Sequence, residues 1–152
     1  MTRRTWVGLF FWVTLFSARR VEAASCGFNS VTSVVFGGYD VFSSTPNDGV
    51  GQLVFQCTVF QLLDTIQINL STGSSNTYSG RTMLHGSDTL SYQLYLDPAR
   101  TQVWGDKSSG TAVFTQGINL LATTVPIYGR IPARQNAKAG DYTDTVVITL
   151  MF

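Results

Sequence analysis

The chain has 152 residues, of which 44% are hydrophobic and only 12% are charged, and its formal net charge is +1. It contains one histidine, His85, and one glutamate, Glu22, so few side chains are available for general acid–base catalysis. We therefore expect no enzyme activity, no cofactor and no metal. Nucleic-acid binding is also disfavoured, because it relies on basic patches that this composition does not provide.

Residues 1–23 have the layout of a secretory signal peptide. Two arginines precede an apolar run over residues 6–16, and the segment closes on Ala23, a small residue after which a signal peptidase would cut. The run is too short for a permanent membrane span, so we expect residues 24–152 to be exported as one domain. That domain keeps 6 basic and 8 acidic side chains, a net charge of −2.

Two cysteines, Cys26 and Cys57, lie in the expected exported domain. An even number of cysteines in an exported protein usually forms disulfides, and a bond here would close a loop of about 30 residues, worth roughly 3–4 kcal/mol. The competing interpretations are metal binding and a reactive thiol. A zinc site is disfavoured, because His85 is the only histidine and stands at no ligand spacing from either cysteine. The segment "AASC" ending at Cys26 is also similar to a lipoprotein box, but the usual leucine is absent.

Alternation of apolar and polar side chains, typical of half-buried strands, recurs along the expected exported domain. We expect strands at residues 28–36, 51–59, 65–70, 89–96, 111–115, 119–128 and 141–152, with shorter pairing segments near 81–84 and 103–104. Turn sequences rich in Gly, Asn, Ser and Asp separate these segments. Short strands separated by frequent turns predict an all-β protein, and specifically a β-sandwich.

The remaining candidate site residues are aspartates, the histidine and several aromatics. The aspartates mostly stand beside Gly, Pro or Asn, which is typical of turns, and we expect His85 to be a solvated turn residue. The sequence contains no Gly-x-Ser-x-Gly elbow and no phosphate-binding loop. Tyr39, Tyr95 and Trp104 are candidates for an exposed aromatic surface that binds carbohydrate. The alternative is that such aromatics belong to the core and to cross-strand pairs.

Several segments follow one another in an order that resembles a known family. They are "VVFGGYDVF" (34–42), "FQCTV" (55–59), "YSGRTMLHGSDTLSYQLYLD" (78–97), "TQVWGD" (101–106) and "VPIYGRIPARQNAKAGDYTDTVVITLMF" (125–152). Together they resemble the spore coat protein U domain, which is shared by the subunits of Csu-type pili, the archaic branch of chaperone–usher fimbriae. The resemblance covers nearly all of residues 26–152.

The resemblance implies an immunoglobulin-like sandwich that lacks its last strand. The final strand then borders a hydrophobic groove, which a chaperone strand fills first and the N-terminal extension of another subunit fills later, in donor-strand complementation. Residues 145–152, "TVVITLMF", support this reading physically, because an uncharged edge strand without Pro or Gly is prone to aggregate unless it is paired. We expect one groove wall to carry Val146, Ile148, Leu150 and Phe152, and the facing wall to carry Phe28, Val34 and Phe36. The alternative is that these residues form the ordinary core of a closed sandwich.

The function that the resemblance implies is that of a structural subunit of a Csu-like surface pilus, which supports adhesion and biofilm formation. Its expected partners are a periplasmic chaperone, an outer-membrane usher and neighbouring subunits. The expected start at Ala24 leaves two residues before Cys26, too few to donate a strand. Either the signal peptide is cleaved earlier, or the chain accepts a strand without donating one and takes a terminal position in a fibre. Two alternatives remain open: a non-fimbrial coat protein on a spore or cell surface, and a carbohydrate-binding adhesin domain.

Overall fold

The computed structural model describes residues 25–59 and 65–152, and the expected signal peptide lies outside these ranges. The strands in the described ranges are β1 (Ser25–Thr32), β2 (Asn47–Val59), β3 (Thr65–Leu70), β4 (Arg81–His85), β5 (Asp88–Tyr95), β6 (Phe114–Gly117), β7 (Thr123–Ile131) and β8 (Ile148–Met151). Two single 3-10 turns, η1 (Gly73–Ser75) and η2 (Ser108–Gly110), lie in the connections. Within the same ranges no helix has the length and hydropathy needed to cross a membrane.

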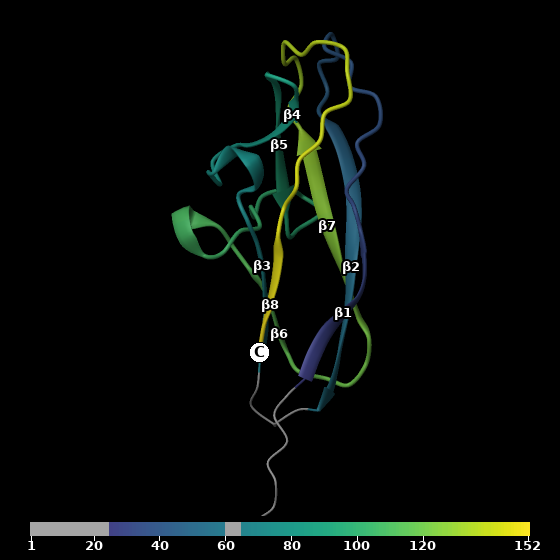
Figure 1. Cartoon of the computed structure of the whole chain (residues 1–152), viewed down its shortest axis with the longest axis vertical. Helices are drawn as coiled ribbons and strands as arrows, with labels where there is room; N and C mark the ends of the chain where they lie inside the picture. The colour runs from purple at the N-terminus through teal and green to yellow at the C-terminus, as the bar shows by residue number, and fades with distance from the viewer. Residues whose placement is uncertain (1–24, 60–64) are drawn as a thin grey trace, which may run out of the picture.

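The strands form two antiparallel sheets. One sheet has five strands in the order β1-β2-β7-β5-β4, and the other has three in the order β6-β3-β8. Figure 1 shows the strands running close to the long axis of an elongated molecule, with β3, β6 and β8 grouped apart from β1, β2 and β7. The prediction of an all-β sandwich is confirmed.

The core lies between the two sheets and is built from the inward-facing residues of each strand. In β7, Val125, Ile127, Gly129 and Ile131 are buried, while the residues that alternate with them are more exposed. In β3, Ile66 and Ile68 are fully buried in the same cluster. A period of two is what a strand with one buried face requires. Each such side chain contributes roughly 1.5–3 kcal/mol through its removal from water.

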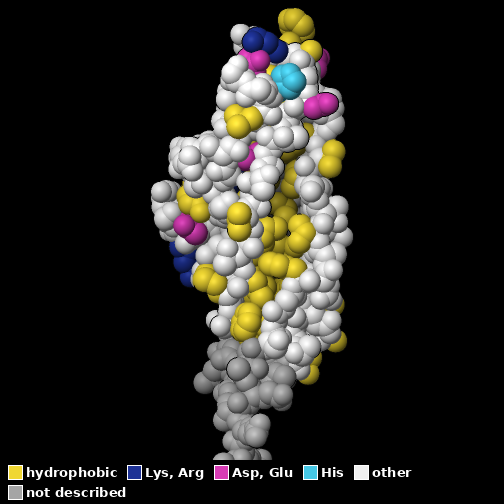
Figure 2. Space-filling model, viewed as in Figure 1, with side chains coloured by type: hydrophobic (Ala, Val, Ile, Leu, Met, Phe, Trp, Pro, Cys, Tyr) yellow, Lys and Arg dark blue, Asp and Glu magenta, His cyan; other side chains and the backbone are white. Residues whose placement is uncertain are grey.

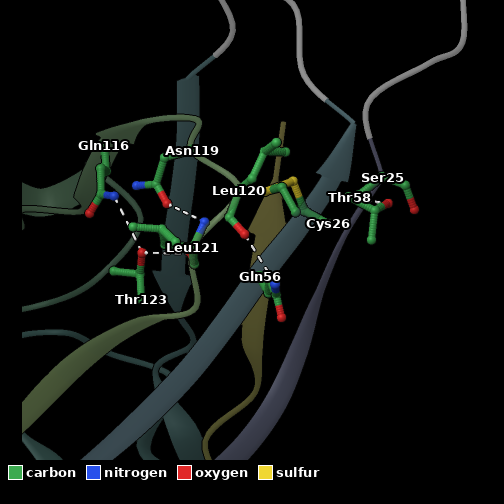
Figure 3. The surroundings of a disulfide bond; sticks show 10 residues. Ser25, Cys26, Gln56, Thr58, Gln116, Asn119, Leu120, Leu121 and Thr123 are labelled. Atoms are coloured by element: carbon green, nitrogen blue, oxygen red, sulfur yellow. Dashed lines mark hydrogen bonds between the residues drawn. A yellow bond between two sulfur atoms is a disulfide. The ribbon is translucent and has the colours of Figure 1, made fainter.

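The expected disulfide is present. Cys26 and Cys57 are directly opposite each other in the β1–β2 ladder, with their Cα atoms 4.0 Å apart, and the bond fixes β1 to the end of β2. Figure 3 shows the bond beside the loop that precedes β7, where the Gln56 side-chain amide donates to the carbonyl oxygen of Leu120 at 3.0 Å. The described part of the chain contains no free cysteine, which leaves neither of these thiols for metal binding or reactivity.

Several expected strands differ from the observed ones at their N-terminal ends, and β2 begins at Asn47 rather than at residue 51. The strand expected at 119–128 begins at Thr123, because the Asn119 side chain accepts a hydrogen bond from the Leu121 amide and forms a turn. The strand expected at 111–115 is displaced to β6. The short segment at 103–104 forms only isolated bridges, to Tyr95 and Ala112.

The first and last expected strands are shorter than predicted, and both differences concern the same region. The strand expected at 28–36 ends as β1 at Thr32, after which the chain leaves the edge of β2. The strand expected at 141–152 pairs continuously only as β8, while residues 141–147 make isolated contacts. These two incompletely paired segments border the candidate site.

Candidate functional site

The candidate site is an apolar groove between residues 31–42 and residues 137–148. It consists of two adjoining cavities. The lower cavity, of about 330 Å³, lies beside the start of β8, and the upper cavity, of about 870 Å³, lies at the pole formed by residues 37–42 and 137–141. Figure 2 shows apolar side chains along an elongated hollow in this face of the molecule. The groove floor is formed by the core residues Leu70, Met83, Leu90, Tyr92, Leu94, Ile127 and Ile131.

The first wall of the groove, residues 32–36, lies across the inner face of the large sheet. This close approach is possible because glycines stand beneath it. A Cβ at Gly51 would lie 2.5 Å from the carbonyl oxygen of Thr32, and a Cβ at Gly129 would lie 2.6 Å from Cγ1 of Val34. Seated there, Phe36 packs edge-on against Tyr92, with ring centroids 6.1 Å apart. Within the described ranges, the backbone of residues 34–36 makes no hydrogen bond.

The second wall, residues 142–148, is hydrogen-bonded on one side only. Thr143 exchanges two backbone hydrogen bonds with Leu84, at 2.8 and 3.1 Å, and Val147 accepts one from the amide of Ser71 at 2.9 Å. In an extended segment successive residues direct their backbone groups to opposite sides. The backbone groups of Tyr142 and Val146 therefore face the other side, and no described residue hydrogen-bonds to them.

A carboxylate fixes the middle of the second wall. Asp144 accepts hydrogen bonds from the Ser74 amide at 2.9 Å and from the Tyr92 hydroxyl at 2.6 Å. Desolvation is the largest influence on the pKa of Asp144 and raises it, but the hydrogen bonds from Ser74, Tyr92 and Thr145 together outweigh it and lower the pKa. Burial raises the pKa of Tyr92, and the neighbouring carboxylate of Asp144 raises it further. The Tyr92 hydroxyl therefore remains protonated and donates its hydrogen bond. These contacts hold residue 144 at one position along the groove.

A fully buried arginine supports the same wall from behind. The Arg81 guanidinium donates to the carbonyl oxygens of Ser71 and Trp104, each at 2.8 Å, and to the Gln93 side chain. Because Ser71 in turn binds the backbone of Val147, Arg81 is linked to the groove wall through one residue. Burial lowers the pKa of the guanidinium, and the fixed fork of donors satisfies three buried acceptors.

The structure brings four of the seven predicted groove residues together. Val34 and Phe36 line the first wall, and Val146 and Ile148 line the second. The other three line neither cavity. Leu150 packs against the core from β8, Phe152 lies beyond the end of β8 with 55% of its surface exposed, and Phe28 lies in β1 with 36% exposed. Phe28 is separated from Val34 because the chain leaves the ladder after Thr32.

Sequence reasoning missed the upper cavity and its small side chains. Ala137, Ala139 and Gly140 line it together with Gly37 and Gly38, and Met83 forms part of its floor. These residues carry no periodic signal, since they lie mainly in loops. The glycine pair in "FGG" and the small residues in "AKAG" were the only hints in the sequence.

The structure does not support the predicted aromatic surface. Trp104 is fully buried, and its indole N–H donates to the carbonyl oxygen of Ile68 at 2.9 Å, so the prediction was wrong for this residue. The Tyr39 hydroxyl donates to the carbonyl oxygen of Pro132 and accepts from the Gln135 amide, both at 2.8 Å, which ties the ring to the protein. Tyr95 is half-buried in β5. The three aromatics therefore form no shared platform.

Several of the predicted polar residues make structural contacts. Asp40, Asp97 and Asp106 accept hydrogen bonds from nearby backbone amides in turns, as expected. His85 is exposed at the end of β4 and packs against Tyr142 at 5.5 Å between ring centroids. Within the described ranges, no three His, Cys, Asp or Glu side chains gather in a way that could hold a metal ion.

Comparisons with known proteins agree on one domain type. The sequence model of the Spore Coat Protein U domain matches residues 13–149. The chain is 39% identical over 123 residues to Protein U of Myxococcus xanthus, a match that covers 76% of this chain and 63% of that protein.

The fold is similar to a chain in the crystal structure of the CsuC–CsuE chaperone–tip adhesion subunit pre-assembly complex, from the archaic chaperone–usher Csu pili of Acinetobacter baumannii. The TM-score is 0.57 at 19% sequence identity, and the alignment covers 86% of this chain and 40% of that one. The match over residues 13–149 includes both groove walls and the glycines beneath the first. The chain therefore belongs to the Spore Coat Protein U domain family.

Proposed function

We propose that this protein is a structural subunit of a surface fibre of the chaperone–usher type, and that its groove accepts an extended strand from another polypeptide. The observation that carries the proposal is the groove itself. It combines an apolar floor with backbone groups on the groove side of both walls to which no described residue hydrogen-bonds. An extended strand matches both features, because it presents alternate side chains to the floor and its backbone groups to the walls.

Burial gives such a strand a driving force. Val34, Phe36, Val146 and Ile148 are only half-buried while they line the open groove. Full burial of a large apolar side chain is worth roughly 1.5–3 kcal/mol, and each of these residues gains part of that amount when the groove is filled. The incoming strand gains the same for its own side chains. An empty groove is therefore also an aggregation hazard.

The likeness to a chain in a complex of a chaperone with a tip adhesion subunit supports the choice of partners. We assign to this chain a periplasmic chaperone, an outer-membrane usher and neighbouring subunits, with the cell surface as its final location. Adhesion and biofilm formation are the roles that such a fibre would serve. The part of the chain described contributes a docking surface rather than a reactive centre. The terminal position expected from the sequence stays a prediction, because residues 1–24 lie outside the described ranges.

The proposal is tested by thermal unfolding and amide hydrogen exchange of the full chain, alone and with a candidate donor peptide or chaperone. We expect the lone protein to aggregate or unfold at low temperature, and a bound strand to raise the midpoint sharply. Exchange at Val146 should slow on binding, while exchange at Thr143 should change little because its amide is already bonded. Cooperative unfolding at high temperature, unaffected by every strand offered, would show that the sandwich is closed.

A second candidate function is that of a coat protein outside any fibre. The family description refers to a spore coat, and the 39% identity to Protein U favours this candidate over a general adhesin role. Chaperone and usher genes beside the gene for this chain would favour the fibre. Accumulation of the protein in a coat layer of cells that lack those genes would favour the coat.

A further inference from the structure

The two cavities of the groove differ in size and meet at a shared middle. The upper cavity is more than twice as large as the lower one, at about 870 against 330 Å³. They share the lining residues Val34, Phe36, Met83, Tyr142 and Thr143, so a single strand that enters one cavity continues into the other. The occupant therefore meets two different environments along its length.

The linings of the two cavities differ in chemistry as well as size. The sides of the upper cavity include several residues with little or no side chain, such as Gly38 and Ala137, beside the larger Phe42 and Lys138. A thioether, Met83, and two aromatic rings, Phe36 and Tyr142, stand where the two cavities meet, and Tyr39 and Phe42 add rings to the upper cavity alone. From β5 the lower cavity adds a branched aliphatic side chain, Leu94, and the ring of Tyr92. From β3, β7 and residues 146–148 it adds the branched aliphatic side chains of Leu70, Ile127, Val146 and Ile148.

These linings favour different side chains in the incoming strand. An aromatic ring in the upper cavity can pack edge-to-face against Phe36 or Tyr142 and contact the sulfur of Met83. A smaller aliphatic side chain leaves much of that cavity unfilled and forfeits its dispersion contacts. The lower cavity is shared by two inward side chains, those opposite Val146 and Ile148, so two aliphatic side chains fit together, whereas a large ring at one position leaves less room for the other.

The spacing follows from the second wall. A strand that pairs along residues 142–148 directs every second side chain into the groove. In the incoming strand, the position opposite Val146 is then four residues from the one opposite Tyr142, and the position opposite Ile148 is two residues further on. This spacing holds for either direction of the strand. The intervening inward position faces Asp144, a carboxylate already bonded to the Tyr92 hydroxyl, and suits a small polar residue.

We propose that the groove selects an extended strand with an aromatic residue at the end beside Tyr142 and aliphatic residues four and six positions away. This inference rests on the proposed function and specifies the chemistry of its partner. The selectivity belongs to the upper cavity, and the lower cavity provides affinity for aliphatic strands in general.

The test uses short Thr-rich peptides and the full chain with its disulfide formed. One peptide carries Trp at an end position and Val four and six residues away, and it is made in both chain directions. The controls carry Val at all three positions, or Trp at the central position. Calorimetry should give the end-Trp peptide, in one direction, a Kd about tenfold lower than that of the all-Val peptide. The central-Trp peptide should bind more weakly than the all-Val peptide.

A cavity-filling variant locates the effect. Ala137→Leu places a larger side chain in the lining of the upper cavity, and it should remove the advantage of the end-Trp peptide, so that the end-Trp and all-Val peptides bind with similar Kd. Gly38→Val serves as a second variant, because a Cβ at Gly38 meets no atom within 4 Å. Equal affinity of the end-Trp and all-Val peptides for the parent chain would overturn this inference and leave the proposed function standing. Failure of every peptide to bind would overturn both.

Discussion

Replacing Gly51 by alanine should displace the first groove wall, and the structure gives the size of the effect. The added Cβ would lie 2.5 Å from the carbonyl oxygen of Thr32 and 2.9 Å from the amide nitrogen of Val34, where ordinary contacts are 3.4–4 Å. The wall must therefore move by roughly 1 Å, and since the contacting atoms belong to the backbone, no side-chain rotation can relieve the clash. Overpacking of this kind costs about 2 kcal/mol, which lowers the Tm of a domain of this size by roughly 6 °C.

Urea unfolding of the disulfide-bonded protein measures this cost directly. Gly117→Ala is the matched control, because it places the same methyl group in β6 where a Cβ meets no atom within 4 Å, and it should stay within about 0.5 kcal/mol of the parent. Gly51→Ala should also weaken the binding of every strand peptide, since the wall that moves lines the groove. If Gly51→Ala and Gly117→Ala unfold at the same urea concentration, residues 32–36 do not rest on β2 and the groove geometry argued above is wrong.

Three further predictions concern the second wall. Ile148→Asp should prevent capture of the protein by a chaperone and its appearance on the cell surface, whereas Thr149→Asp, on the exposed side of β8, should be tolerated; equal surface accumulation of the two variants would contradict the model of the groove. Arg81→Leu should lower the free energy of unfolding by at least about 3 kcal/mol, because it leaves buried carbonyl oxygens without donors. Arg81→Lys should recover only part of that free energy. A loss below about 1 kcal/mol for Arg81→Leu in urea titrations would refute the assigned role. The pKa of Asp144 is lowered in the folded state, so this carboxylate should stabilise the fold above the usual carboxyl pKa of about 4. That contribution is lost as the pH falls through the folded-state pKa. Asp144→Asn should therefore make the free energy of unfolding less dependent on pH on the acid side than it is in the parent.

The second wall was accessible to sequence reasoning because its signal is local. Alternation alone places Val146 and Ile148 on one face of an extended segment, and both line the groove. The same alternation placed Phe152 in the groove as well, and this prediction was wrong. Phe152 follows the alternating pattern, but it lies beyond Met151, the last residue of β8 that pairs with β3. A period of two fixes the face on which a side chain lies, but it does not show where the neighbouring strand ends.

The first wall was only partly predictable, because its position depends on residues distant in sequence. Phe28 and Phe36 have the same parity, yet the chain leaves the ladder between them and only Phe36 reaches the groove. The path of residues 32–36 requires glycine at positions 51 and 129, which belong to two other strands. A glycine in a strand indicates that a bulge or another segment lies close to it, but the sequence does not show which segment that is. Trp104 illustrates the same limit, since its burial depends on a carbonyl 36 residues away.

The two walls are supported from behind by different interactions, and this determines how the groove responds to change. Packing on glycines holds the first wall, while the hydrogen bonds of Arg81 and Asp144 hold the second. Both supports lie within this one chain and need no occupant. The cost of ordering the walls is therefore met on folding rather than on binding, which favours tight capture of a strand. Substitutions behind the walls should therefore weaken all donor strands by similar factors, because they disturb the common scaffold. Substitutions among the lining residues should change which strand is preferred, because they alter contacts that differ from one side chain to the next.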